Sequence, residues 1–448
     1  MHELQDIVSQ EVVLKDIVSE CLELAKKSVD AIEVVVKKTR GISVSVRKGV
    51  SEYIEFNNDG KLFITVYNNN RKGCAVSTNF SISSIRRTLQ SAIMITHFTS
   101  SDRYSGLPNY DTLAIDSTLN LDLLHPIIFD INIAADLAIS AEIAAYNFDK
   151  RIINTEGVAF DSHFSSIVCG NSIGLLNGYS SSLHSLSCCS VAKEKTCMQR
   201  DYAFSISRKI THLDSSEHIG KESARRSIDR LFPRKIKTTK SPIIFSSEVA
   251  PSLFYNFISA INGDNVYKKS TFLLNKLGKN IFPNFLNIKD YPHISQGLGS
   301  KPFDNEGVRT KDNLIVDKGR LISWLLDSYA SCKLGFDSTG HAGGVHNLLI
   351  EGSGELDLVN LLKYMGKGLL VTELMGSGVN IITGNYSRGV FGFWIENGMI
   401  KYPVSEITIS GNLKEIFRNI IKIGNDINKN SIIQCGSVLV SEMQISGL

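Results

Sequence analysis

The sequence has 448 residues, 43% of them hydrophobic and 21% charged, with a formal net charge of +3 at pH 7. A chain of this length can bury a large core in two or three domains, and its composition is that of an ordinary globular protein. The small net charge argues against a nucleic-acid partner, and no apolar run of about 18 residues predicts a membrane span.

The N-terminus lacks the basic-then-apolar pattern of a signal peptide, so we expect a cytoplasmic protein without membrane attachment. Its eight cysteines are scattered without Cys-x-x-Cys spacing. In a reducing compartment they are predicted to be free thiols, most of them buried.

The first 125 residues are predicted to form an N-terminal α+β domain, in which helices cover an antiparallel sheet. Residues 11–28 carry apolar side chains at helical spacing. Residues 42–46 alternate between apolar and polar side chains, and the segments 53–56 and 62–67 flank Asn57-Asn58-Asp59-Gly60, which predicts a meander with a turn at Asp59-Gly60. A second amphipathic helix is predicted from about Ser81, and residues 98–126 are interpreted as a connecting segment.

Residues 126–236 are predicted to form a central region that contains one helix and a β-meander. The helix spans about residues 131–148, is apolar on nearly every side and is expected to lie buried between layers. Short strands are expected between residues 152 and 207. A further helix over residues 214–232 ends at Pro233, because proline cannot continue helical hydrogen bonding.

Residues 237–448 are predicted to form a β-rich C-terminal domain. A strand over 241–245 precedes a helix over 249–261. Further on, glycines divide the chain into four short strands, Leu369–Leu374, Val379–Thr383, Gly389–Ile395 and Met399–Tyr402. The Asn397-Gly398 pair between the last two strands predicts a two-residue hairpin turn.

General catalytic motifs give little support for a reaction. The sequence has no Walker loop and no dinucleotide-binding glycine fingerprint. Residues 170–174 match Gly-x-Ser-x-Gly, but we interpret them as a turn, because short strands surround them instead of the strand-to-helix step of a nucleophile elbow. Asp304 and Glu306 are a candidate carboxylate pair, although acidic residues in such a segment are more often turn formers.

His341 and His346 are the candidate metal ligands. Two consecutive glycines lie between them and disfavour a helix, so the two imidazoles would have to converge from a loop. We favour a structural or peptide-contacting role for this loop and keep metal binding as the alternative.

Several long segments carry a resemblance to a known family. They are Leu374–Asn380, Gly384–Gly398, Tyr402–Leu413, Met198–Tyr202, Val266–Phe272, Phe303–Thr310, Ser338–Gly344 and Ile433–Leu439. Together they resemble the PmbA (TldE) branch of the TldD/PmbA family, with Asn385 where relatives usually carry Asp. The resemblance covers nearly the whole chain and implies a cytoplasmic bacterial protein associated with zinc-dependent proteolysis of peptides.

In the TldD branch, the helix after the strand that corresponds to residues 241–245 carries a His-Glu-x-x-x-His motif. The two histidines hold zinc, and the glutamate can act as general base on the zinc-bound water. The corresponding degenerate positions in this sequence are Phe254, Tyr255 and Ser259, which cannot replace two imidazoles and a carboxylate. The resemblance therefore implies no catalytic residue and no metal in this chain, with zinc expected in a partner subunit.

The implied function is that of a PmbA/TldE-like component of a zinc metalloprotease system that degrades or trims unstructured peptides. The implied partner is a TldD-type catalytic subunit in a heterodimer, and the isolated chain is a candidate homodimer. An extended peptide is expected to add a strand to a sheet edge of the C-terminal half. The candidate peptide contacts are His341, Gly343, Asn347, Gly376, Gly378, Asn380 and Arg388.

Two alternatives remain open from the sequence. The first is an autonomous metallopeptidase with a non-standard metal site near His341 and His346. The second is a peptide-binding protein without enzymatic activity. Neither the natural peptide nor the stoichiometry of a complex follows from the sequence.

Overall fold

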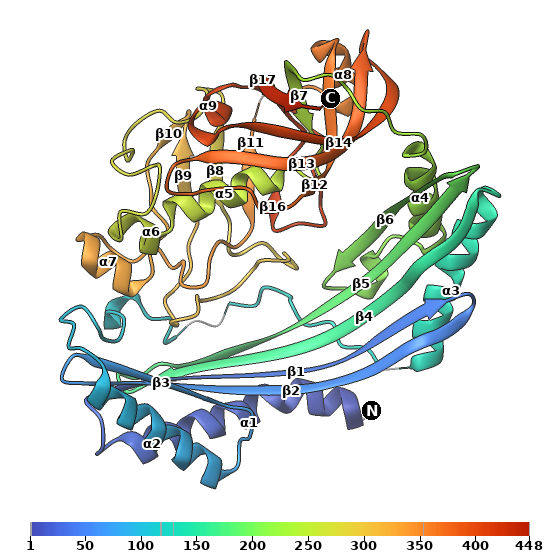
Figure 1. Ribbon diagram of the computed structural model, residues 1–448. Helices are drawn as coiled ribbons and strands as arrows, with labels where there is room; N and C mark the ends of the chain where they lie inside the picture. The colour runs from blue at the N-terminus through green and yellow to red at the C-terminus, as the bar shows by residue number, and fades with distance from the viewer. Residues whose placement is uncertain (1, 117–118, 129, 353, 448) are drawn as a thin grey trace. The chain divides into compact units, whose positions relative to one another are not determined.

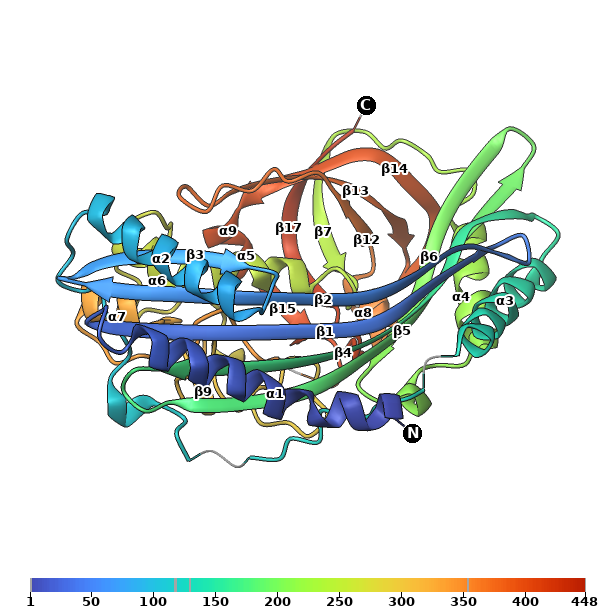
Figure 2. The same cartoon turned by 90° about the horizontal axis from the view of Figure 1, so that it is seen from below.

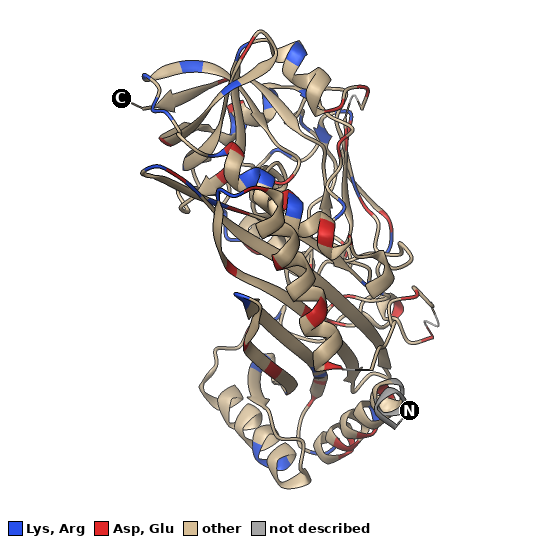
Figure 3. Cartoon of the chain, turned by 90° about the vertical axis from the view of Figure 1, so that its right-hand side faces the viewer, with Lys and Arg blue, Asp and Glu red and all other residues tan. Residues whose placement is uncertain are grey.

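The computed structural model describes residues 2–116, 119–128, 130–352 and 354–447. It has an α+β fold, as the sequence predicts, and divides into two compact units (Figure 1). The first unit comprises residues 1–228, 293–310 and 327–343, and the second comprises residues 229–292, 311–326 and 344–448. The domain boundaries expected after residues 125 and 236 stay a prediction. Acidic and basic residues are interspersed along the described chain, in keeping with the small net charge (Figure 3).

One six-stranded antiparallel sheet organises the first unit, in the order β3-β2-β1-β4-β5-β6. Its strands are β1 (Ala31–Arg47), β2 (Val50–Asn68), β3 (Arg71–Ser77), β4 (Ile152–Asn171), β5 (Leu176–Glu194) and β6 (Cys197–Ser207). In β1 the alternate residues Ile32, Val34 and Val36 are buried, whereas the residues between them are only partly covered. This is the period of two that places apolar side chains on one side of a sheet.

Helices cover the buried side of this sheet at one end. They are α1 (His2–Ala25) and α2 (Ile82–Phe98), which lie below the sheet in Figure 1 and in front of it in Figure 2. Val18 and Cys21 of α1 and Ile85 of α2 join Val34 and Ile64 in one buried apolar cluster. The remaining α-helices of the unit are α3 (Ile131–Phe148), α4 (Ser216–Asp229) and α7 (Ser328–Leu334). None of the helices in the described part of the chain is both long and apolar enough to cross a membrane.

Long hairpins replace the short strands expected in this unit. β2 continues through Asp59 and Gly60, which pair with Thr39 and Lys38 of β1, so the turn predicted at Asp59-Gly60 is wrong. Pairing along the whole length of β1 outweighs the local turn tendency of an Asp-Gly pair. The chain turns instead at Lys48-Gly49, where both residues have positive φ, 54° and 73°.

The short strands expected between residues 152 and 207 likewise merge into β4, β5 and β6. The Gly-x-Ser-x-Gly segment 170–174 contains the turn between β4 and β5, as interpreted from its flanks. The side chain of Asn171 accepts the backbone N–H groups of Ile173 and Leu175, each at 3.1 Å, and so stabilises this turn.

Two sheets build the second unit, in the orders β10-β9-β8-β11-β16 and β14-β13-β12-β7-β17-β15, with an additional pairing of β14 with β17. The strands of the first are β8 (Asn287–Asp290), β9 (Asn313–Asp317), β10 (Arg320–Leu321), β11 (Leu348–Glu351) and β16 (Ile433–Gln434). Those of the second are β7 (Thr239–Phe245), β12 (Gly368–Met375), β13 (Asn385–Glu396), β14 (Met399–Asn412), β15 (Ile420–Ile423) and β17 (Val438–Ser446). The α-helices are α5 (Pro251–Ile261), α6 (Gly263–Tyr267), α8 (Leu358–Met365) and α9 (Leu413–Arg418).

The glycine-rich stretch of this unit confirms one prediction and corrects another. Asn397 and Gly398, with φ of 53° and 71°, form the two-residue turn between β13 and β14, as predicted. Residues 379–383 are not a strand, and only Val379 forms a single bridge, to Tyr386. The side chain of Asn380 accepts backbone N–H groups two and three residues further on, so local hydrogen bonds replace strand pairing.

A buried carboxylate holds the Lys48-Gly49 turn. Glu142 of α3 is 1% exposed, and its oxygens accept the backbone N–H groups of Lys48 at 2.8 Å and of Gly49 at 2.7 Å. They also accept the hydroxyl of Thr155 at 2.5 Å. One side chain of α3 therefore joins the end of the β1–β2 hairpin to β4.

We predict that Glu142→Ala lowers the free energy of unfolding by about 2–4 kcal/mol, because three donors lose a buried acceptor. Chemical denaturation followed by circular dichroism measures the change. Glu142→Gln retains one acceptor oxygen and is expected to lose less. Equal stability of the parent and Glu142→Ala would contradict this role.

Candidate functional site

Helix α5 carries the degenerate motif positions. It follows β7 and begins at Pro251, which a helix tolerates in its first turn. Phe254 is fully buried, whereas Tyr255 is 50% exposed and Ser259 is also exposed. The three side chains therefore do not converge on one point, because α5 directs the first into the core and the other two toward solvent.

Phe254 belongs to an aromatic cluster in the second unit. We define this cluster as Phe254, Phe257, Phe272, Phe282 and Phe417. The ring of Phe254 lies 6.2 Å from that of Phe282, which in turn lies 5.2 Å from Phe257 and 4.9 Å from Phe417. Aromatic rings at such separations contribute packing energy beyond the area they bury.

The residues present on α5 do not fit zinc. Phenylalanine has no lone pair to donate, and a buried ring leaves no room for an ion beside it. The exposed hydroxyls of Tyr255 and Ser259 are neutral and bind zinc poorly. No step of a metal-dependent reaction can be assigned to this helix.

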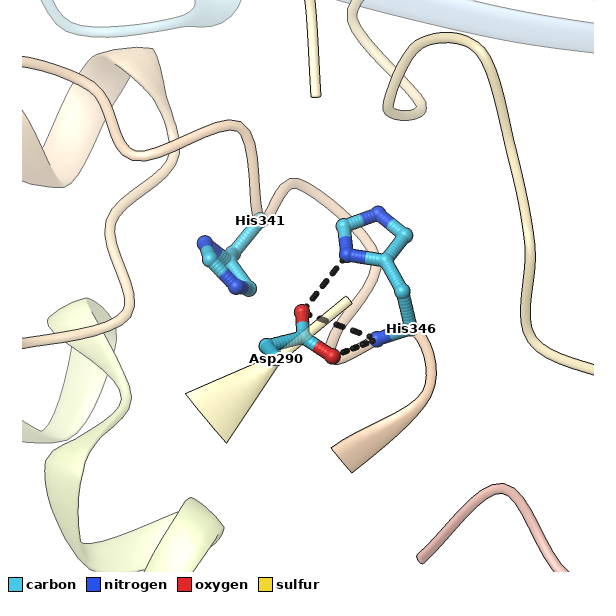
Figure 4. A group of neighbouring side chains, drawn as sticks. All are labelled: Asp290, His341 and His346. Carbon is cyan, nitrogen blue, oxygen red and sulfur yellow. Dashed lines mark hydrogen bonds and ion pairs between the residues drawn. The ribbon is translucent and has the colours of Figure 1, made fainter. Parts of the chain in front are cut away.

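An aspartate–histidine pair lies at the adjacent ends of β8 and β11. Asp290 is fully buried and His346 is 2% exposed. Figure 4 shows both carboxylate oxygens of Asp290 against the backbone N–H of His346, at 3.0 and 3.1 Å, and one oxygen 2.7 Å from its Nδ1. A carboxylate on Nδ1 fixes the tautomer and orientation of an imidazole, as carboxylates do behind metal-binding or proton-transferring histidines.

His341 lies on the other side of the unit boundary, which falls between Gly343 and Gly344. It is 3% exposed, and its Nδ1 lies 2.9 Å from the hydroxyl of Thr339. Asp290, His341 and His346 can each offer one ligand atom to a metal. Within the second unit only Asp290 and His346 belong to this set, and two protein ligands are fewer than zinc sites use.

Asp304 is a turn former, as the sequence favoured. It is 2% exposed, and one oxygen accepts the backbone N–H groups of Glu306 at 2.9 Å and Val308 at 3.0 Å. The other accepts the N–H of Ala342 at 3.0 Å. The carboxylate thus joins two loops of the first unit, 303–308 and the loop that follows His341.

Glu33 joins Asp304 and Glu306 in a group of interacting carboxyls that the sequence analysis missed. Burial, followed by repulsion from Glu306, raises the pKa of Asp304 to about 7. Burial raises the pKa of Glu33 to about 7 as well, with Glu306 and Asp304 adding to the effect and Lys72 opposing it. Glu33 and Val35 are two residues apart in β1 and therefore lie on the same side of the sheet, where Val35 packs in an apolar cluster with Phe303. Val35 lies on the side of β1 opposite to Val34 and Val36. An apolar residue there could have indicated, from the sequence alone, that both sides of the sheet are covered.

The candidate peptide contacts belong to both units of the chain. Gly376, Gly378, Asn380 and Arg388 lie around the connection between β12 and β13, where Arg388 donates to the carbonyl of Met375 at 3.1 Å. Asn347 is buried before β11 and donates to the carbonyl of Tyr291 at 2.7 Å. His341 and Gly343 belong to the first unit. Each of the hydrogen-bonded residues has a structural role, and contact with a peptide stays a prediction.

The raised pKa of Glu33 predicts a pH-dependent stability. Its folded pKa of about 7 lies above the ordinary 4.5, so its burial costs nothing in acid and destabilises the fold increasingly as pH rises from about 4.5 to about 7. Glu33→Gln removes this cost. The variant is expected to gain about 1–3 kcal/mol in free energy of unfolding at pH 8 and little at pH 4.5.

Urea denaturation between pH 4.5 and 8 measures this difference. Glu55→Gln, which makes the same substitution at an exposed position of β2, serves as the matched control and should follow the parent. If the free energy of unfolding of Glu33→Gln changed with pH in the same way as that of the parent, the prediction would be refuted.

The Asp290–His346 pair predicts a large loss on truncation. Asp290→Ala leaves the N–H and Nδ1 of His346 without their carboxylate in a buried site, so we expect about 3–5 kcal/mol lower free energy of unfolding. Asp290→Asn, which keeps one acceptor, should lose less. Thermal and chemical denaturation provide the measurement, and an unchanged midpoint for Asp290→Ala would show that the pair is not structural.

Three family models match the chain. They are described as PmbA/TldA metallopeptidase domain 1 over residues 32–96, the central domain over 125–231 and the C-terminal domain over 238–447. The metalloprotease PmbA of Escherichia coli O157:H7 is 54% identical over 403 residues, which cover 90% of this chain and 89% of the relative.

Buchnera aphidicola of Acyrthosiphon pisum has two relatives of this chain. Its metalloprotease PmbA homolog is 51% identical over 90% of both chains, and its metalloprotease TldD homolog is 21% identical over 83% of this chain and 80% of the relative. The PmbA homolog is thus far more similar to this chain than the TldD homolog is.

Solved structures share the fold. A proposed modulator of DNA gyrase from Bacteroides thetaiotaomicron superposes with a TM-score of 0.91 at 26% identity, covering 97% of this chain and 99% of the other. TldE from Thermococcus kodakarensis superposes with a TM-score of 0.84 at 20% identity, over 96% of this chain and 100% of the other. With the family models and the identity to PmbA, these matches agree with the resemblance found in the sequence: the chain belongs to the PmbA/TldD metallopeptidase family, in its PmbA branch.

Proposed function

We propose that this chain is the component of a cytoplasmic zinc metalloprotease system that lacks a zinc motif of its own and works with a TldD-type catalytic subunit. The substrates of the system are unstructured peptides, which it degrades or trims. The observation that carries the proposal is the burial of Phe254 within the aromatic cluster, at a position where the catalytic branch needs a zinc ligand.

The packing on α5 supports a subunit without its own metal. Restoring a motif would require a histidine in place of a fully buried phenyl ring, which would leave a polar imidazole in an apolar core. It would also require Tyr255 and Ser259, which point toward solvent, to approach the same ion. The helix is therefore stabilised by the features that make it unsuitable for zinc.

The comparisons support the pairing indirectly. One Buchnera strain carries both a PmbA homolog and a TldD homolog, and a structural neighbour of this chain is a TldE protein. Two members of one fold in one organism allow one to retain the catalytic groups while the other provides binding surface. This division of roles is part of the proposal.

Unpaired strand edges support peptide binding by strand addition, but among the described strands the edge with most unpaired backbone lies in the first unit and not, as expected, in the C-terminal half. In the C-terminal sheet, Thr408–Ser410 of β14 pair with Gln444–Ser446 of β17, which removes part of the edge expected there. In the first unit, β3 covers only Leu62–Asn68 of β2. No other strand in the described ranges pairs with the outer side of β2 before Leu62, which leaves backbone groups available to an added strand.

The test is an assay of a flexible peptide with this chain alone, with its TldD-type partner alone and with both. We expect chelator-sensitive cleavage that requires the partner and is at least about tenfold faster with both, because a completed binding cleft positions the substrate. Tyr255→Phe and Ser259→Ala in this chain should leave the combined rate unchanged. Strong, chelator-sensitive cleavage by this chain alone would overturn the proposal.

One observation favours a second candidate, an autonomous metallopeptidase. The carboxylate on Nδ1 of His346 orients that ring, as carboxylates do behind metal-binding histidines, and His341 is the second candidate ligand that the sequence offers. Elemental analysis of the purified chain separates the two functions. Stoichiometric zinc that is lost in His341→Ala would support the second candidate, and metal-free protein that still stimulates its partner would exclude it.

A further inference from the structure

A small cavity lies in the second unit, outside the loops considered so far. Its volume is about 160 Å³, and its lining consists of Leu273, Lys276, Ile281, Lys414, Phe417 and Arg418. The apolar members are nearly fully buried, with exposed fractions of 2% for Leu273, 5% for Ile281 and 1% for Phe417. Lys414 and Arg418 are exposed and Lys276 is half-buried, so an apolar floor carries a cationic rim.

The local fold explains this division. Phe417 points inward from α9 and packs in the aromatic cluster, with its ring 4.9 Å from that of Phe282. Lys414 and Arg418 are four residues apart, which places them on the same outer side of α9. The side chains on this short helix thus supply both the floor and part of the rim.

The opposite wall is a loop held by backbone hydrogen bonds. Its start is fixed by the hydroxyl of Thr271, which donates to the carbonyl of Ala260 in α5 at 2.6 Å. The N–H of Lys276 donates to the carbonyl of Leu273 at 2.9 Å, and the N–H of Ile281 donates to that of Gly319 at 2.9 Å. The cavity is therefore largely formed before any ligand enters, which lowers the entropic cost of binding.

The rim has no acidic counterpart. The lining contains three cations and no carboxylate. Among the residues that the structure describes, no ion pair joins Lys276, Lys414 or Arg418 to an Asp or Glu. Three positively charged side chains that line one cavity beside apolar residues favour a ligand that is apolar at one end and anionic at the other.

We propose that this cavity binds the C-terminal residue of a peptide, with its apolar side chain on the floor and its α-carboxylate at the rim. The volume is below the roughly 300 Å³ at which sites for whole small molecules begin, and it suits one residue. Arg418 can hold a carboxylate through two parallel N–H donors, while the lysines act as point charges. A free phosphate matches the rim but gains nothing from the apolar floor.

The inference rests on the proposed function only in that the ligand is a peptide, and it adds that the chain recognises a free peptide end. A product of peptide cleavage carries such an end, as does a substrate trimmed from its C-terminus. Binding at this cavity requires neither zinc nor the partner subunit.

The test measures binding without proteolysis, using the full chain. The probe is a peptide labelled with fluorescein at its N-terminus that ends in Gly-Ser-Gly-Leu with a free carboxylate, followed by fluorescence anisotropy. The same peptide with a C-terminal amide, or with Gly as the last residue, should bind at least about tenfold more weakly. The amide loses the negative charge that the cationic rim binds, and the Gly peptide loses the apolar side chain that contacts the floor.

Variants locate the site. Lys414→Gln combined with Arg418→Gln should weaken binding of the free acid about tenfold and should bring its affinity close to that of the amide. Lys401→Gln, an exposed lysine of β14, is the matched control and should bind like the parent. Both altered residues of the double variant are exposed, so circular dichroism should show an intact fold.

Three results would overturn the inference: equal binding of acid and amide, no effect of the double variant, or displacement of the probe by inorganic phosphate as effectively as by unlabelled peptide. Failure of the proposed function is distinguishable. If the acid binds selectively but the combined subunits do not cleave, only the proposed function fails. If they cleave while acid and amide bind alike, only this inference fails.

Discussion

Packing of the aromatic cluster is the constraint on which the second unit depends. Phe254 and Phe257 place α5 against Phe282, and Phe282 places α9 through Phe417. A close-packed core of this kind tolerates neither a void nor an unpaired polar group. The same contacts therefore keep a buried phenyl ring, which has no lone pair for a metal, at position 254, and they supply part of the apolar lining of the cavity beside α9. One packing arrangement thus determines both what α5 presents to the core and the apolar side of that cavity.

The first unit depends on buried polar groups as much as on its apolar core. Glu142 ties a helix to a hairpin end, and Asp304 ties two loops together through three backbone N–H groups. Such carboxylates are costly to bury but specify one arrangement of the chain, because few other geometries satisfy their acceptors. Loops joined in this way keep their conformation without belonging to a helix or strand.

Most elements were predictable from the sequence, and the errors arise in two ways: long-range pairing replaces the turn at Asp59-Gly60, and local hydrogen bonds of Asn380 replace the strand expected over 379–383. The helix over residues 131–148 and the Asn397-Gly398 hairpin follow from local patterns, and the structure contains both. The expectation that this helix lies buried between layers is wrong, because Ile133 and Ile143 are 58% and 52% exposed and small alanines form its buried side. The Asp59-Gly60 turn fails because long-range pairing with β1 outweighs a local preference. The candidate site was partly accessible: Asp290 continues the inward alternation of Leu286 and Ile288, which is a readable signal of a buried acid. Glu33 was harder to identify, because Asp304 and Glu306 lie about 270 residues further along the chain and no local sequence pattern predicts that they meet it.

The division of the chain into units has a consequence for its architecture. The path passes between the units five times, after residues 228, 292, 310, 326 and 343. The stretch matched by the C-terminal family model therefore contributes segments 293–310 and 327–343 to the unit built mainly by the N-terminal half. Val308 in the first of these segments bridges to Leu113, and the carbonyl of Gly307 accepts the N–H of Ala114. No single cut separates the two units. A fragment that ends near residue 230 would lack two segments of the first unit and would expose the backbone groups of Leu113 and Ala114 that these segments pair with.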